Sequence, residues 1–143
     1  MQRKELHEIT STTALTVQRT GYAAAAAQIL ACFVPVVSIP GVYRLTWLET
    51  GRLGELVLAL GLCSAWFVYR GRYDRAAWCG AFSAVIAWVV YFELMFQGPR
   101  ITIDPNTWYG GSPSVGLFIS MLAPIVLVAL PIVTRRHIAQ PHN

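Results

Sequence analysis

The residues best able to do chemistry in this chain are two glutamates, Glu55 and Glu93, each near the end of a long apolar segment. A carboxylate inside a membrane segment is costly, so it raises the hypothesis of a functional site. If both lie near the same membrane surface, they form a polar cluster that can bind a proton, a cation or another ligand. The predicted members of this outer cluster are Glu55, Glu93, Arg52, Arg100, Trp108 and Tyr109.

A second interpretation of the same residues is purely structural. In it, Glu55 and Glu93 reach the interface or pair with an arginine, which fixes the ends of their helices. The aromatic pair Trp108 and Tyr109 lies between two turn-forming stretches, and it fits either a lid over the cluster or an anchor at the membrane surface. Both interpretations remain open at the level of sequence.

Other reactive side chains are poorly placed for catalysis. All three histidines fall in the terminal tails, so no haem or metal site is expected within the apolar segments. They are His7, His137 and His142. The serines of the apolar segments have no histidine or lysine there to act as a base. We therefore expect a non-enzymatic protein that has no catalytic residues, no cofactor and no metal.

The positions of the cysteines also argue against a reactive site. Cys32, Cys63 and Cys79 lie in three different apolar segments, with no C-x-x-C motif and no adjacent pair. Redox and metal-carrier chemistry in small membrane proteins uses close thiol pairs, so this spacing argues against it. Lone cysteines in membrane helices usually serve as small packing residues.

Composition indicates the solvent that surrounds these elements. The chain has 143 residues, of which 55% are hydrophobic and 13% are charged. An average soluble domain has roughly 25% charged residues. The mean hydropathy is +0.50, and a chain of this length buries only one modest core. The remaining apolar surface therefore needs a lipid bilayer around it.

Charged residues divide the chain into four apolar segments. No charge lies between Arg19 and Arg44 or between Asp104 and Arg135, and the two middle segments reach spanning length only with the glutamates inside their helix ends. The predicted spans cover about residues 21–39, 53–69, 76–96 and 114–134. A re-entrant hairpin in the middle is the alternative, but the charged connector 70–75 belongs in water.

Basic residues predict the orientation, because lysine and arginine are retained in the cytoplasm. Four spans place both termini on one side, and eight of the eleven basic residues fall there. These eight are Arg3, Lys4, Arg19, Arg70, Arg72, Arg75, Arg135 and Arg136. The formal charge of +4 is thus explained by topology and anionic headgroups, and no nucleic-acid-binding motif is present.

The sequence therefore predicts an all-α integral membrane protein of the cytoplasmic (inner) membrane, a four-helix transmembrane bundle with both termini inside. A cytoplasmic segment, 1–20, and a tail, 135–143, flank the membrane domain 21–134. Small residues, such as Ala23–Ala27 and the Gly80 and Ala84 pair, are typical of helix contacts in lipid.

Two functions from different classes are expected for such a protein. The preferred hypothesis is an accessory or interaction subunit of a larger membrane complex, with a membrane protein partner or self-association. The alternative is a small proton- or cation-coupled carrier or channel, which acts as a homo-oligomer through Glu55 and Glu93.

Overall fold

The protein is described from a computed structural model, which is mostly helical. It describes the backbone of residues 2–39, 43–96, 101–104, 107–109 and 112–138, and the side chains of residues 14–38, 44–96 and 112–135. The helices are α1 (Gln2–Ala31), α2 (Arg52–Tyr69), α3 (Tyr73–Phe96) and α4 (Val115–Ile138), with a short 3-10 helix η1 (Trp47–Thr50). The strands are β1 (Pro35–Ile39), β2 (Tyr43–Thr46), β3 (Ile101–Asp104), β4 (Thr107–Tyr109) and β5 (Ser112–Pro113).

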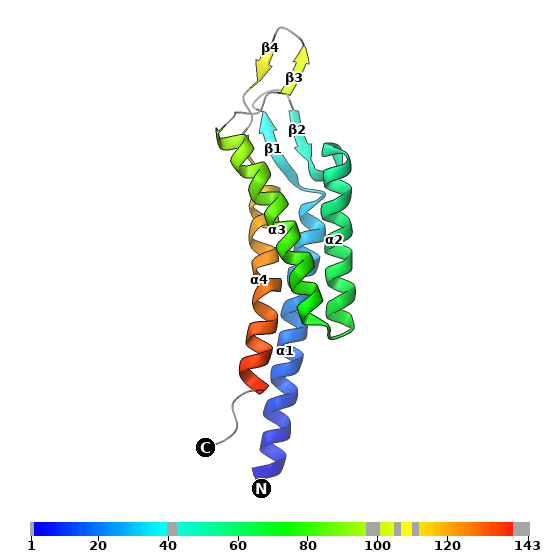
Figure 1. Cartoon of the computed structure of the whole chain (residues 1–143), viewed down its shortest axis with the longest axis vertical. Helices are drawn as coiled ribbons and strands as arrows, with labels where there is room; N and C mark the ends of the chain where they lie inside the picture. The colour runs from blue at the N-terminus through cyan, green and yellow to red at the C-terminus, as the bar shows by residue number, and fades with distance from the viewer. Residues whose placement is uncertain (1, 40–42, 97–100, 105–106, 110–111, 139–143) are drawn as a thin grey trace.

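Three of these helices, α2, α3 and α4, are long and apolar enough to cross a membrane. Helices α1 and α3 each pack against both α2 and α4, so α1 and α3 lie diagonally opposite one another. Figure 1 shows both termini at one end of the molecule and the strands at the other. The predicted segments 53–69, 76–96 and 114–134 thus correspond closely to α2, α3 and α4.

Small residues allow the helices to approach closely. A Cβ atom added at Gly80 would lie 3.1 Å from the main-chain oxygen of Pro124, and one added at Gly61 would lie 3.0 Å from Cγ1 of Ile29. Apolar surface alone does not drive association in lipid, so such close backbone contacts are a main source of helix packing there. The predicted contact role of Gly80 therefore agrees with its place between α3 and α4.

The first predicted span differs from the structure at its C-terminal end. The helix of α1 ends at Ala31, and residues 35–39 form strand β1. Pro35 cannot donate a helical hydrogen bond, and the valines that follow it favour an extended backbone. In the other direction, α1 runs unbroken from Gln2, so no helix boundary separates residues 1–20 from the rest of α1.

The strands are a departure from an all-α fold. Strand β1 lies at the centre of a three-stranded antiparallel sheet in the order β2-β1-β5, and β3 and β4 form a separate antiparallel pair. Residues 112–113, which directly precede α4 in the sequence, pair with β1. The amide of Ser114 donates to the carbonyl of Val36. The sheet thereby connects the ends of α1, α2 and α4.

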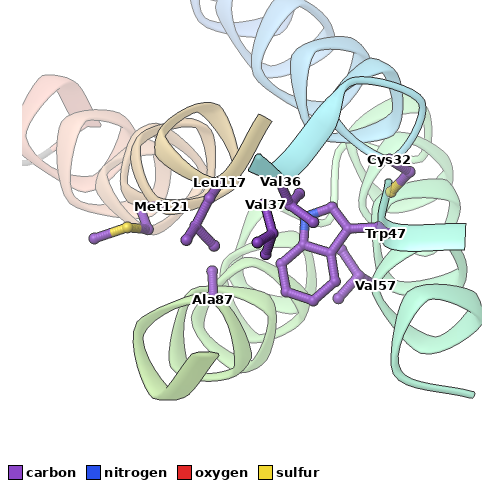
Figure 2. Packing of buried hydrophobic residues seen from close by; sticks show 8 residues of the cluster. All are labelled: Cys32, Val36, Val37, Trp47, Val57, Ala87, Leu117 and Met121. Carbon is purple, nitrogen blue, oxygen red and sulfur yellow. The ribbon is translucent and has the colours of Figure 1, made fainter. Parts of the chain in front are cut away.

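A buried cluster lies between the sheet and the helices (Figure 2). Its centre is Trp47 of η1, whose side chain is fully buried. The members of the cluster are Cys32, Val36, Val37, Trp47, Val57, Ala87, Leu117 and Met121. Because these residues come from the turn after α1, from β1 and η1, and from α2, α3 and α4, this cluster fixes the strand-bearing end of the molecule.

Candidate functional site

The predicted outer cluster is only partly brought together. Glu55 in the first turn of α2, Arg52 and Glu93 are all exposed at the strand-bearing end. Among the described side chains, no hydrogen bond or ion pair joins any two of these three. Glu93 also lies six residues further from the α2–α3 turn at Gly71 than Glu55 does, which is about 9 Å along a helix.

The other predicted members of the outer cluster are Arg100, Trp108 and Tyr109. Arg100 lies outside the described residues. Trp108 and Tyr109 belong to β4, where their backbones pair with Thr102 and Ile101 of β3. A role of this strand pair as a lid stays a prediction.

The interior contains one fully buried polar side chain from each of the four helices. These are Gln28 of α1, Ser64 of α2, Ser83 of α3 and Ser120 of α4. Across the diagonal between α1 and α3, Nε2 of Gln28 donates to Oγ of Ser83 at 2.8 Å. The carbonyl oxygen Oε1 of Gln28 is buried without a hydrogen-bond partner among the described groups.

Trp47 makes the second buried polar contact. Its indole Nε1 donates to Oγ of Ser120 at 2.8 Å, and that hydroxyl donates to the main-chain oxygen of Gly116. Figure 2 shows the indole between the valines of β1 and Val57 of α2. The short helix η1 is therefore attached to α4 by both packing and a directed hydrogen bond.

These interior contacts are suited to fixing helix positions. Ser64 and Ser120 donate to carbonyls one turn back in their own helices, and Ser83 accepts from Gln28. Nucleophilic use of a serine requires a base within hydrogen-bond distance. No hydrogen bond of these three described serines involves a histidine or a carboxylate. Their geometry supports helix packing and register.

One extended feature of the surface is a stripe of large apolar side chains on α3, which we call the α3 ridge. Its members follow one another at alternating spacings of four and three residues, and all are exposed. They are Trp78, Phe82, Val85, Val89, Phe92 and Phe96. This spacing matches the seam along which one helix packs against another at a small crossing angle.

Aromatic contacts stiffen the ridge. The rings of Phe92 and Phe96 stack at a centroid distance of 5.9 Å, and Trp78 and Phe82 lie 6.4 Å apart. Glu93 falls four residues after Val89 and three before Phe96, so its carboxylate emerges beside the ridge near the strand-bearing end of the molecule. The sequence-based search identified Glu93 but not its surroundings, because only the packing shows which face of α3 is free.

The opposite end of the molecule is basic. Arg135 of α4 forms an exposed ion pair with Asp74 of α3 at 2.9 Å, and the guanidinium of Arg70 lies 4.8 Å from the ring centre of Trp66. Further exposed arginines at this end are Arg19, Arg72 and Arg75. This end carries five of the eight basic residues that were predicted to be cytoplasmic.

The structure also places two cysteines, which come from different apolar segments of the sequence, on one helix hairpin. Cys63 of α2 is exposed and Cys79 of α3 is half-buried, whereas Cys32 is buried in the core. Cys63 lies within electrostatic reach of Cys79. The signal available in the sequence was their equal distance from the turn, since each lies eight residues from Gly71.

Comparison with known proteins finds no matching family model, no matching curated protein and no matching solved structure.

Proposed function

We propose that this chain is a small, non-enzymatic accessory or interaction subunit of a larger membrane complex, and that it docks onto its partner through the α3 ridge. In this proposal the four helices form a transmembrane bundle in the cytoplasmic membrane, with both termini inside. The strands then lie at the outer surface and the arginine-rich end at the inner one.

Two observations support this arrangement in the membrane. Helices α2, α3 and α4 are long and apolar enough to span, and Gly21 of α1 packs against Val68 of α2 and Leu130 of α4. The part of α1 from Gly21 onward is therefore level with the spanning helices. Of the seven exposed arginines whose side chains the structure describes, five lie at the end that also holds the termini, as expected for a cytoplasmic face.

The orientation can be tested with protease. Trypsin that is added to the outer face of intact cells should leave the α2–α3 turn uncut, and it should cut at Arg70 and Arg72 once the inner face is exposed. Cleavage of the turn from the outside would contradict the proposed orientation.

The observation that carries the docking proposal is Glu93 beside the ridge. No described residue forms a hydrogen bond or an ion pair with its exposed carboxylate. An unpaired charge next to an apolar helix face is costly near the membrane and favours a partner with the opposite charge. The partner that fits is a membrane helix with small or apolar residues along one face and an arginine or lysine near its outer end.

Substitution of Glu93 gives the direct test, with Glu55 as the matched control. Glu55→Gln removes the same charge at the same end of the molecule but away from the α3 ridge. We expect Glu93→Gln to release the partner when the protein is extracted in mild detergent and its mass is measured, and Glu55→Gln to retain it. A wild-type chain that is always an unaccompanied monomer would refute the subunit proposal.

Photo-crosslinking tests whether the ridge is the surface involved. A photoreactive side chain at Phe82 should capture the partner, whereas one at Leu62, an equally exposed position on α2, should capture only lipid. Equal capture from both positions would show that the α3 ridge is not selective.

The second candidate is a proton- or cation-coupled carrier or channel. Both Glu55 and Glu93 are exposed outside the packed interior, so a second copy of the chain would be needed to enclose them. In proteoliposomes, the double variant with glutamine at both positions should then abolish pH-dependent flux. Flux that is unchanged in this variant would exclude the carrier.

A further inference from the structure

The helices α2 and α3 form a hairpin whose turn is centred on Gly71. Residues equally distant from this turn lie at the same level in the two antiparallel helices, because both rise by the same amount per residue. Cys63 lies eight residues before Gly71 and Cys79 eight residues after it. Both thiols are therefore at one level, about 12 Å along the helices from the turn.

The two cysteines also lie on facing sides of the hairpin. One turn closer to Gly71, the guanidinium of Arg75 lies 5.9 Å from the ring centre of Phe67, so these side chains meet across the α2–α3 seam. Cys63 is four residues before Phe67, and Cys79 is four residues after Arg75, so each occupies nearly the same helix face one turn on. This placement agrees with the position of Cys63 within electrostatic reach of Cys79.

The surroundings limit what such a pair can bind. Within the described residues, no group of three or more histidine, cysteine, aspartate or glutamate side chains is arranged to hold a metal. Zinc requires about four such ligands, so two sulfurs alone do not satisfy it. A pair of thiols suits a soft ion that accepts two ligands in a line.

Charge selects among such soft ions. A monovalent ion between two thiolates leaves one negative charge, which is costly in the apolar region that these helices would cross. A divalent ion between two thiolates gives a neutral complex. The surroundings therefore favour a divalent ion.

We propose that Cys63 and Cys79 form a two-thiol site, on the exposed side of the α2–α3 seam, for a divalent thiophilic ion that binds two sulfurs, with Hg(II) as the probe. On binding, the two S–H bonds break, two metal–sulfur bonds form and two protons pass to the solvent. No electrons are transferred. The site is independent of the proposed docking surface, because it uses neither the ridge residues nor Glu93.

The test uses the full chain in detergent, kept reduced by a phosphine and loaded with one equivalent of HgCl2. Excess 2-mercaptoethanol then competes for the ion, and native mass spectrometry counts the ions that remain. Two sulfurs on one chain act as a chelate, which raises affinity by about 100-fold or more over a single thiol. We expect the wild type and the control Cys32→Ala to retain one ion, and Cys63→Ala and Cys79→Ala to lose it.

A second measurement reports the bridge itself. Trypsin cuts at the exposed Arg70 and Arg72 and separates α2 from α3 in the chain. In the loaded wild type, the fragments that carry Cys63 and Cys79 should stay joined under denaturing conditions and separate when thiol is added. Cys63 is exposed, so its alanine variant should keep the helix content of the wild type by circular dichroism.

Three results would overturn the proposal. The first is retention of the ion by Cys63→Ala equal to that of the wild type. The second is loss of the ion in Cys32→Ala, and the third is separation of the fragments in the loaded wild type.

Discussion

The buried amide of Gln28 makes an unusual prediction about the sign of a mutational effect. Its Nε2 donates to Ser83, but its Oε1 is buried without a partner among the described groups. A buried polar atom that lacks a hydrogen bond costs about 1–3 kcal/mol, whereas a hydrogen bond between membrane helices contributes about 0.6 kcal/mol. Gln28 therefore destabilises the fold more through its oxygen than it stabilises the fold through its nitrogen.

Gln28→Met removes both atoms and keeps an unbranched chain of similar length. The hydroxyl of Ser83 still has its proton to donate to the carbonyl of Cys79 one turn back, as Ser64 and Ser120 do in their helices, so it is not left without a partner. The net expectation is a gain of about 1 kcal/mol in the free energy of unfolding. Ser83→Ala alone should instead cost about 1–3 kcal/mol, because it leaves the whole amide unpaired.

Reversible unfolding in mild detergent titrated with dodecyl sulfate measures both effects, with the fluorescence of the five tryptophans as the signal. In a double-mutant cycle, Ser83→Ala should have almost no effect once Gln28 is methionine. A loss of more than about 1 kcal/mol in Gln28→Met would refute the reasoning, because Oε1 would then have a stabilising partner.

Three further predictions concern the ends of the molecule. Trp47→Ala should cost about 3–5 kcal/mol of unfolding free energy, since a fully buried indole is lost together with its bond to Ser120; a cost below about 1 kcal/mol would contradict this packing. Gly54→Ala should lower the free energy of unfolding by about 3 kcal/mol, because the new Cβ would collide with the carbonyl oxygen of Trp47. A melting temperature equal to that of the wild type would show that η1 moves freely. Asp74→Asn should change stability by less than about 1 kcal/mol and should have no effect in high salt, because the bond to Arg135 is largely exposed; a larger effect that resists salt would indicate a buried pair.

Three helical segments could be predicted well from the sequence. The segments 53–69, 76–96 and 114–134 match α2, α3 and α4 within a few residues at most boundaries. Their hydropathy is high and charged residues mark their ends, so the solvent requirement alone identifies them. The connector between α2 and α3 was also visible as residues 70–75, because its charges exclude it from an apolar environment, although α3 already begins at Tyr73.

The segment 21–39 could not be resolved in the same way. Its apolar run is continuous in sequence, but the helix stops at Ala31 and β1 begins at Pro35. Hydropathy reports which residues avoid water and does not report the backbone conformation. The pairing of β1 with β5 joins residues more than seventy positions apart, and no local pattern encodes such a contact.

The candidate sites show the same division. Glu93 could be selected from the sequence because a carboxylate near the end of an apolar helix is costly. Its isolation beside the α3 ridge depends on which face of α3 its neighbours α2 and α4 cover. The proposed pairing of Cys63 with Cys79 likewise depends on how tightly the turn brings α2 and α3 together.

By itself, the sequence determined the apolar surroundings, three long apolar helices and a charge distribution that predicts the orientation. Each of these properties is a sum over individual residues, so it can be obtained without knowing which residues are in contact. Only the tertiary structure decided the burial of Trp47, the hydrogen bond between Gln28 and Ser83, and the placement of Cys63 and Cys79 on adjacent helices of one hairpin. Such contacts depend on helix rotation and relative height, because a turn of 100° per residue moves a side chain from the interior to the surface.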